Sequence, residues 1–355
     1  MAKKRFSSEI EALLDSYTSH LEGPDQDLAR EIVTTALKMS EEQVSRLDRK
    51  IVNTALKELR HAFRVFAPYK GVRKVSVFGS ARTVRGDPAY IAARDFSKMI
   101  AEEGWMVITG AGPGIMEAGH EGAGGAKSFG ANIILPFEAK PNPVIAQDQK
   151  LINFKYFFTR ELTFMKEADA FVLLPGGFGT MDEAFELLTL MQTGKSDLHP
   201  VVLLDPPGGD YWAKFDSYLK EELIARGYVD DDDTSLYRRV DDPKQAVAEI
   251  EQFYRVYHSQ RIVGRRLIVR LNSAPDKAML ELLSEEFSDI LSKPIKPVPP
   301  STSEVRDEDV PELPRIALAF DRQHVGRLRQ LIDRLNDVGP VPQRAPSEKG
   351  DPKTL

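Results

Sequence analysis

The chain has 355 residues, of which 42% are hydrophobic and 29% charged, so it is long enough for one full-sized domain with flanking units. Lys and Arg number 48 and Asp and Glu 54, a net charge of −6 that gives no general footprint for nucleic acid. The sequence has no cysteine, which excludes disulfides and thiolate sites, and no apolar run long enough for a signal peptide or membrane span. We expect a cytoplasmic protein that binds neither nucleic acid nor membranes.

The N-terminal part is predicted to be helical. Residues 6–66 contain almost no Gly or Pro and carry apolar residues at helical spacing. The run Ser40-Glu41-Glu42-Gln43 has the form of a capping box and predicts the start of the last helix, which Pro68 stops. We predict residues 1–70 to be a helical extension that packs on the main domain or on a second subunit.

From residue 72, short β-rich runs alternate with helical stretches, the pattern of a parallel α/β sheet with helices on both faces. The helix Pro243–Tyr257 is predicted to close this domain, which we assign to residues 71–258. The predicted strands are Val75–Phe78, Met106–Thr109, Asn132–Leu135, Ala170–Leu174, Val201–Leu204 and Leu236–Val240.

After about residue 260 the chain twice repeats a β-rich run followed by an amphipathic helix, Lys277–Leu291 and Val325–Leu335. Between them, residues 293–314 are Pro-rich and then acidic, which predicts an extended or mobile linker. We predict residues 259–355 to be a small C-terminal βα module. Its role stays open between regulation, oligomerisation and cover for the sheet edge.

Three of the predicted strands end in glycine-rich turns: FGSAR, TGAGPG and PGGFGT. Ligands bind outside the carboxyl ends of parallel strands, so these turns point to one shared pocket. We predict a substrate site formed by Gly79, Ser80, Gly110, Gly112, Gly114, Met116, Gly176, Gly177, Gly179 and Thr180.

The turn PGGFGT joins a buried strand to a helix, a geometry that favours an anion such as phosphate. It lacks the Gly-Lys-Ser/Thr of a Walker A loop, and the glycines could instead serve only a tight strand-to-helix turn. The second turn is no dinucleotide fingerprint, because position 115 is Ile and the turn follows the second strand. We therefore do not favour NAD binding.

Acidic residues follow the third turn. Asp182, Glu183 and Glu186 could simply favour the helix N-terminus. A carboxylate one turn beyond a phosphate site also lies where a ribose would sit, so Glu183 could orient a water or stabilise positive charge on the sugar. Arg160, on an apolar and aromatic stretch, could extend to solvent or pair with an acid.

The run PGGFGTMDE resembles the PGGxGTxxE signature of the LONELY GUY (LOG) family, formerly labelled "possible lysine decarboxylase". VSVFGSAR, WMVITGAGPGIMEAGHEGA, NIILPFEAKPNP and YFFTRELTFMKEADAFVLL are similar to further blocks of its longer bacterial members, in order, across residues 72–258. The resemblance implies a Rossmann-like fold and a cytokinin riboside 5′-monophosphate phosphoribohydrolase. It further implies a homodimer or higher homo-oligomer with sites near the subunit interface.

The family's catalytic pair is an Arg fifteen positions before the signature proline and the signature's final Glu, which correspond here to Arg160 and Glu183. Two positions depart from the family pattern. Glu161 stands where a Lys usually follows the Arg, and Ala111 interrupts a common triple glycine. The first departure changes the charge beside Arg160, and the second is a small steric change.

The activity we predict is hydrolysis of the N-glycosidic bond of a purine nucleoside 5′-monophosphate, with adenine or N6-modified adenine as the base. We expect no metal and no organic cofactor, since the sequence offers no Cys/His cluster. A pyridoxal phosphate decarboxylase is disfavoured because no lysine stands beside the glycine-rich turns. The alternative of another class is a non-catalytic nucleotide-binding sensor or regulatory protein.

Overall fold

The computed structural model describes residues 8–135, 140–307 and 309–340. The chain forms two compact units that divide between Arg60 and His61. In the described ranges, no helix is both long and apolar enough to cross a lipid bilayer.

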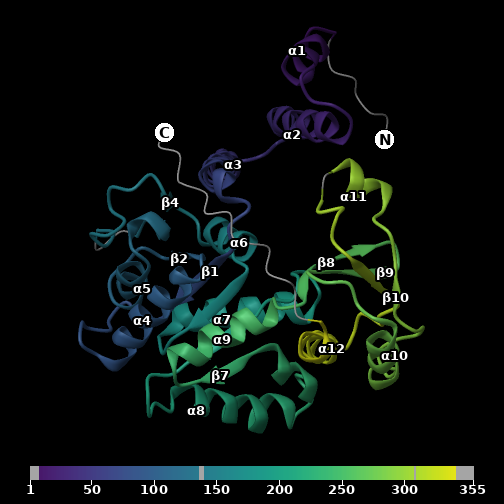
Figure 1. Ribbon diagram of the computed structural model, residues 1–355. Coiled ribbons are helices and arrows are strands. Elements are labelled where there is room, and N and C mark those ends of the chain that lie inside the picture. Colours follow the sequence, from purple (N-terminus) through teal and green to yellow (C-terminus); the bar gives the residue numbers. More distant parts are fainter. Residues whose placement is uncertain (1–7, 136–139, 308, 341–355) are drawn as a thin grey trace. The chain divides into compact units, whose positions relative to one another are not determined.

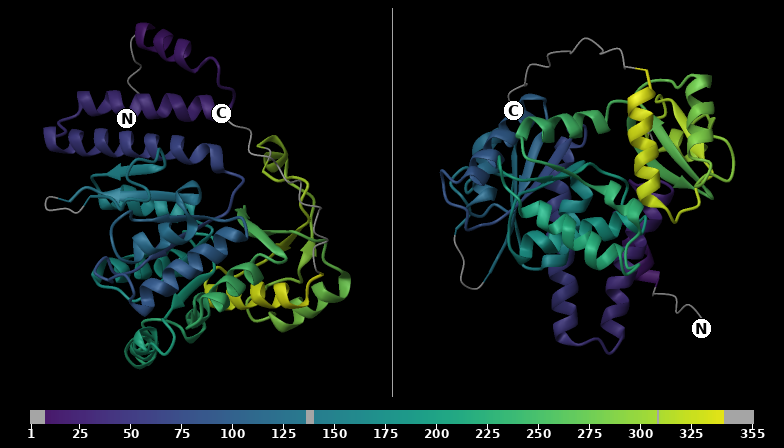
Figure 2. Two further views of the ribbon diagram at one scale, coloured as in Figure 1. Left: turned by 60° about the vertical axis from the view of Figure 1, so that its left-hand side comes forward. Right: turned by 90° about the horizontal axis from the view of Figure 1, so that it is seen from below.

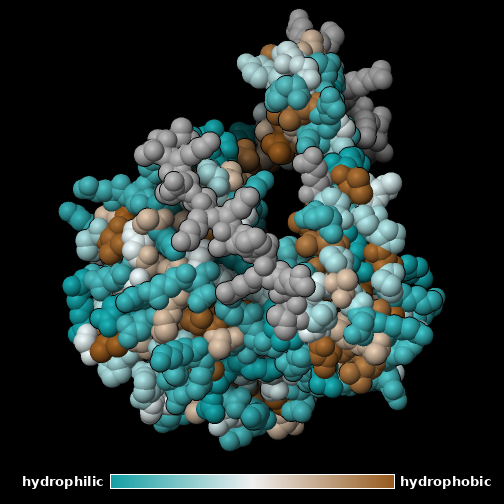
Figure 3. Space-filling view, in the orientation of Figure 1, coloured by the Kyte–Doolittle hydropathy of each residue, from teal (hydrophilic) through white to brown (hydrophobic). Residues whose placement is uncertain are grey.

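The first unit contains α1 (Ser8–Thr18), α2 (Pro24–Glu41) and most of α3 (Arg46–Phe66), all in purple in Figure 1. Arg30 joins α2 to α1 through ion pairs with Glu11, at 2.6 Å, and with Asp15. Several large apolar side chains of these helices, among them Leu28 and Ile32, stay exposed, and Figure 3 shows apolar residues among polar ones on their visible surface.

The capping-box prediction at Ser40 is wrong. Helix α2 continues through Ser40, and α3 begins five residues later than expected. The cap is Ser45, whose Oγ accepts a hydrogen bond from the Asp48 N–H at 3.1 Å and donates to the Asp48 carboxylate at 2.7 Å. The patterns Ser40-x-x-Gln43 and Ser45-x-x-Asp48 therefore compete five residues apart, and the one after the helix break is the cap.

The second unit contains a seven-stranded sheet in which all neighbouring strands are parallel, so the predicted Rossmann-like α/β class is confirmed (Figure 1). The strand order is β4-β3-β2-β1-β5-β6-β7. The strands are β1 (Lys74–Phe78), β2 (Met106–Thr109), β3 (Ser128–Ile133), β4 (Leu151–Phe154), β5 (Ala170–Leu173), β6 (Val201–Leu204) and β7 (Arg238–Val240). Sequence analysis missed the edge strand β4, which is four residues long and half-buried.

Helices cover both faces of this sheet (Figures 1 and 2). One face packs against α4 (Pro88–Glu102), α5 (Ile115–Ala123) and α9 (Pro243–Phe253), with Phe96 and Val172 in its core. The other packs against the end of α3, α6 (Phe157–Glu167), α7 (Phe178–Gln192) and α8 (Tyr211–Tyr218), with Phe129 and Leu187 in its core. Short 3-10 helices span Ala67–Tyr69, Gly125–Lys127 and Asp231–Leu236, and a π-helical turn spans Leu219–Ile224.

The strand order reverses beside β1, because β2 pairs with one edge of β1 and β5 with the other. Such a reversal opens a crevice outside the carboxyl ends of the two strands, where ligands of open α/β sheets bind. The turns FGSAR and PGGFGT follow these two strands. The topology therefore brings the first and third glycine-rich turns to the switch point.

The C-terminal part folds as an antiparallel sheet in the order β10-β11-β9-β8, with two main helices. Its elements are β8 (Tyr257–Val263), β9 (Arg266–Leu271), α10 (Lys277–Glu286), β10 (Lys296–Pro297), α11 (Thr302–Arg306), β11 (Arg315–Leu318) and α12 (Val325–Val338). The helix expected over Pro243–Tyr257 ends at Phe253, because Tyr257 already pairs with Leu271 in β8–β9.

The prediction of an extended linker over 293–314 is wrong for the part that forms β10 and α11. Its Glu304 is buried and accepts a hydrogen bond from Arg270 Nη2 at 2.9 Å. Arg315, also buried, lies 3.6 Å from the same carboxylate. Two buried arginines on adjacent strands need a carboxylate, and this segment supplies it.

Helix α12 fixes this part to the parallel sheet. The fully buried Arg329 pairs with Glu249 of α9 at 2.6 Å and with Asp333 at 2.8 Å, and its guanidinium lies 4.7 Å from the Phe253 ring. Asn336 accepts hydrogen bonds from two backbone N–H groups at the start of β8. Both sheets share one apolar core.

Gly114 and Gly124 offer a matched test of packing at the second turn. Both have positive φ, but a Cβ on Gly114 would lie 2.8 Å from the Ala81 carbonyl carbon, whereas one on Gly124 would meet no atom within 4 Å. We expect backbone strain of about 1–3 kcal/mol in Gly114→Ala and Gly124→Ala, and a further ~1–3 kcal/mol in Gly114→Ala alone. Equal losses in denaturant unfolding would contradict the close approach of the two turns.

Candidate active site

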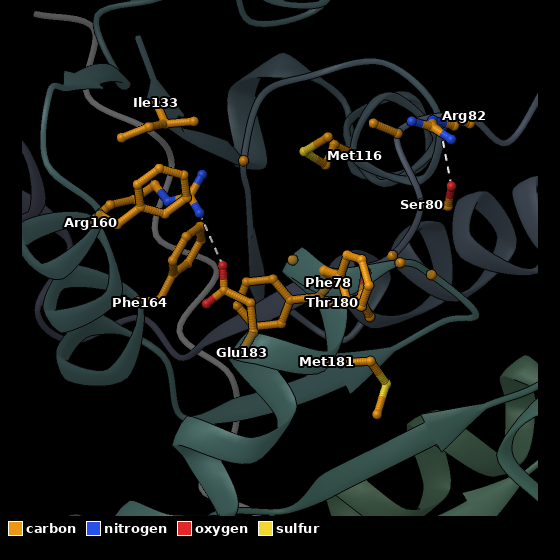
Figure 4. A pocket seen from close by; sticks show the side chains of 18 of the residues that line it. Phe78, Ser80, Arg82, Met116, Ile133, Arg160, Phe164, Thr180, Met181 and Glu183 are labelled. Atoms are coloured by element: carbon orange, nitrogen blue, oxygen red, sulfur yellow. Dashed lines mark hydrogen bonds and ion pairs between the residues drawn. The ribbon is translucent and has the colours of Figure 1, made fainter. Parts of the chain in front are cut away.

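A cavity of about 810 Å³ lies outside the carboxyl ends of β1, β2 and β5 (Figure 4). Residues of all three glycine-rich turns line it, together with side chains of α6 and α7. The lining includes the predicted Gly79, Ser80, Gly110, Met116, Arg160, Gly176, Gly177, Gly179, Thr180 and Glu183. Gly112 and Gly114 do not line it: Gly112 packs under Met116, and Gly114 packs against Ser80 and Ala81.

The first turn connects the other two through one residue. The backbone N–H of Ser80 donates to the Pro175 carbonyl at 3.2 Å, and the Ser80 carbonyl accepts from the Ile115 N–H at 3.1 Å. Close approach requires small residues here, because a Cβ on Gly79 would lie 2.7 Å from the Ile115 side chain. The three turns thus form one continuous cavity wall.

The second turn contains a strained residue. Ala111, which interrupts the family's triple glycine, has φ of 62°, a conformation that costs a non-glycine residue about 1–2 kcal/mol. Asn142 holds this turn, because its Nδ2 donates to the carbonyls of Ala111 at 3.0 Å and Gly112 at 3.1 Å. Asn142 also contacts His120, whose pKa burial lowers, so that imidazole is neutral. Sequence reasoning missed both supporting residues, since neither lies in a glycine-rich turn.

The third turn leads into α7 with Gly177 as N-cap and no side chain capping the helix. The first N–H groups of an α-helix have no intrahelical partner, and together with the helix dipole they favour an anion. Thr180 is buried in this first turn, and Tyr211 fixes the turn by donating from its hydroxyl to the Gly176 carbonyl at 2.7 Å. Chemically, this side of the cavity can accept a phosphate.

Arg160 and Glu183 meet inside the cavity (Figure 4). Arg160 Nη2 donates to Glu183 Oε1 at 3.1 Å, and the side chains are only 11% and 6% exposed. The Arg160 guanidinium also lies 4.8 Å from the Phe157 ring. Arg160 Nε and Glu183 Oε2 are buried without a hydrogen-bond partner. One carboxylate oxygen is therefore left for a water or a substrate group.

Burial raises the pKa of Glu183 to about 8. The positive charge of Arg160 opposes this shift, while the charges of Glu161, Asp182 and Glu186 add to it. The pKa values of Glu161 and Glu186 are also raised, chiefly by burial. Carboxylate oxygens of Glu161, Glu183 and Glu186 lie within 4.8 Å of one another, close enough to share a cation. No second feature of the described residues points to a metal there.

Arg82 is a site residue that sequence analysis missed. It lines the same cavity from the first turn, and its backbone N–H donates to Ser80 Oγ at 3.1 Å (Figure 4). Within the described residues its guanidinium forms no ion pair, whereas Arg85, three residues on, pairs with Glu117 at 2.7 Å and with Glu121. The final Arg of FGSAR was the available signal.

Comparisons with known proteins identify the family. Residues 114–250 match the family model described as "Possible lysine decarboxylase". A cytokinin riboside 5′-monophosphate phosphoribohydrolase of Mycobacterium marinum is 30% identical over 140 residues, 37% of this chain and 68% of that protein. Its namesake from Mycobacterium tuberculosis is 28% identical over 165 residues, 44% and 81% of the two chains. The chain belongs to this family, the LOG family.

A solved structure of a molybdenum cofactor binding protein from Rippkaea orientalis is also similar, with 22% identity. The match covers 51% of this chain and 96% of that chain, with a TM-score of 0.37. That score is too low for the likeness to bear on fold or function.

The raised pKa of Glu183 predicts a pH-dependent stability difference from Glu183→Gln. Glu183 ionises near pH 4.5 in the unfolded chain and near pH 8 in the folded one. The contribution of Glu183 to stability is therefore fully present below pH 4.5 and is lost as the pH rises to 8. We expect the melting temperature of Glu183→Gln, measured relative to that of the wild type, to increase as the pH rises from about 5 to about 9. Asp210→Asn, at an exposed ion pair with Lys214, is the control. A pH-independent difference for Glu183→Gln would contradict the shift.

Proposed function

We propose that the protein hydrolyses the N-glycosidic bond of a purine nucleoside 5′-monophosphate, with adenine or an N6-modified adenine as base, to free base and ribose 5-phosphate. The observation that carries this proposal is the buried Arg160–Glu183 pair, with its free Oε2, in the same cavity as an uncapped helix N-terminus. Residues 71–258 would form the catalytic domain. The family resemblance supports a homodimer or higher homo-oligomer.

The phosphate binds at the third turn in this proposal. The free N–H groups at the start of α7 and the buried Thr180 hydroxyl supply neutral donors. Arg82 supplies a charge, since its guanidinium is unpaired within the described residues and borders the cavity. The purine lies against apolar side chains that line the same cavity, among them Ile133, Phe157 and Phe164.

Hydrolysis breaks the bond between C1′ and the base nitrogen and forms one between C1′ and water oxygen. The ribose becomes positively charged as the bond breaks, so an ionised carboxylate stabilises the transition state more than the ground state. Glu183 takes this role in its ionised form, which predominates above its pKa of about 8, and positions the attacking water through Oε2. Arg160 orients Glu183 and assists departure of the base, which leaves with a proton.

The experiment that tests the function is chromatographic detection of base released from AMP and from adenosine. Because phosphate binding positions the reacting ribose, we expect kcat/KM for AMP to exceed that for adenosine by about 100-fold or more. Glu183→Gln should lower turnover by about two orders of magnitude while AMP still binds. Equal specificity constants would refute the phosphate site. Binding of AMP without release of adenine would favour the non-catalytic sensor.

Arg82→Gln tests the charge at the phosphate. We expect it to lower kcat/KM for AMP by about 10- to 100-fold, because a charge-assisted hydrogen bond is lost, and to leave the slow cleavage of adenosine unchanged. Arg85→Gln is the matched control, since Arg85 lies on the same loop but is paired outside the cavity. A similar loss in both variants, or with both substrates, would remove Arg82 from phosphate recognition.

A further inference from the structure

A second cavity, of about 230 Å³, lies where the end of α7 meets the C-terminal sheet and α12. Leu198, Leu267, Phe320 and Leu328 form much of its apolar wall. Pockets for drug-sized ligands measure about 300–1,000 Å³, so this one suits a smaller molecule, of amino-acid size. It shares no lining residue with the candidate active site.

Two opposite charges border this cavity. Asp197 and Arg322 both line it, and in the described part of the chain neither forms an ion pair, with the other or with a third residue. The positive charge of Arg270 acts on Asp197, but the Arg270 guanidinium donates its hydrogen bonds to Glu304, Asp309 and Ser259. The cavity therefore offers an anion, hydrogen-bonded to Gln260, and a cation, and neither has an ion-pair partner among the described residues.

The Gln260 side chain hydrogen-bonds Asp197 and also offers the cavity an acceptor without a partner. Gln260 lines it, and its Oε1 is buried without a hydrogen bond. A buried acceptor left unsatisfied is unfavourable, and a ligand donor would satisfy it. The C-terminal end of α7, the negative end of the helix dipole, borders the same space through Thr193 and Gly194. All three acceptors favour a ligand that carries an ammonium group.

The backbone conformation of Arg322 is independent evidence for a site. It has φ of 69°, one of the few non-glycine residues with positive φ among those described. Such strain persists where the surroundings hold it and is concentrated at functional sites. One guanidinium nitrogen donates to the Gly264 carbonyl at 2.8 Å, which fixes the side chain and leaves other N–H donors for a ligand.

We propose that this cavity binds a small apolar α-amino acid. Asp197 and Gln260 Oε1 bind its ammonium group, Arg322 binds its carboxylate, and the leucine-rich wall contacts its side chain. The site is independent of the proposed function, because it uses none of the residues assigned to nucleotide hydrolysis.

Isothermal calorimetry on the full chain, without nucleotide, tests the proposal with three matched probes. L-Leucine carries both charged groups, 3-methylbutylamine lacks the carboxylate and 4-methylpentanoate lacks the ammonium. We expect saturable binding of leucine, at least about tenfold tighter than either partial probe, since each partial probe loses the charge-assisted hydrogen bonds at one end. Phenylalanine and valine report which side-chain size fits.

Two substitutions test which residue binds the ammonium group of the amino acid and which binds its carboxylate. Asp197→Asn should weaken leucine and the amine by tenfold or more and leave the carboxylic acid unchanged. Arg322→Gln should reduce leucine to the affinity of the amine. Both residues are exposed at the surface, so circular dichroism should report a native fold. Asp210→Asn, a surface acid outside the cavity, is the control and should bind leucine normally.

Three outcomes would overturn the site. One is that no tested amino acid shows saturable binding at concentrations up to about 10 mM, so that any Kd is weaker than millimolar. Another is that the amine or the acid alone binds as tightly as leucine. The third is that folded Asp197→Asn and Arg322→Gln keep wild-type affinity. Loss of base release from AMP would refute the proposed function and leave this binding measurement unaffected.

Discussion

The backbone N–H and carbonyl of Ser80 join the three glycine-rich turns, and the candidate site depends on this junction. Its N–H bonds the third turn and its carbonyl bonds the second. A Cβ on Gly79 would meet Ile115, and one on Gly176 would lie 3.1 Å from the Ser80 nitrogen. The glycines are therefore a packing requirement first, and the cavity wall they form is the consequence. The structural and functional interpretations of the glycine-rich turns are two aspects of one arrangement.

The Arg160–Glu183 pair opposes stability rather than supporting it. Desolvation outweighs the attraction of Arg160 for the Glu183 charge, and each side chain keeps a buried atom without a partner. A buried ion pair can often be replaced by apolar residues without loss of stability, so packing alone gives no reason for this one. Its place in the cavity that the three glycine-rich turns line gives a reason, because functional sites retain such unfavourable groups.

Sequence patterns predicted the features that depend on residues close together in the chain. Alternating runs located six of the strands in the parallel sheet, although β3 begins at Ser128 and ends at Ile133 instead of spanning the predicted Asn132–Leu135. The glycine-rich turns gave a large part of the cavity lining. They missed β4, whose four residues are stabilised by pairing with β3 rather than by a hydrophobic run. They also missed β10 and α11. This segment is held through Glu304, whose hydrogen-bond partner Arg270 lies 34 residues away along the chain. The role of Arg82 in the cavity, like the support of Ala111 by Asn142, depends on contacts between distant segments that spacing along the chain does not encode.

Helix α7 connects the two parts of the second unit. Its first turns contain Thr180 and Glu183, its last turn borders the second cavity, and α12 packs against its side. The fifteen residues of α7 thus border the candidate active site at one end and the second cavity at the other. Because Arg329 and the shared core fix α12 in the same unit, the C-terminal module is part of the scaffold that positions α7. The position of Glu183 and of the helix N-terminus therefore depends on packing from both sheets of the second unit.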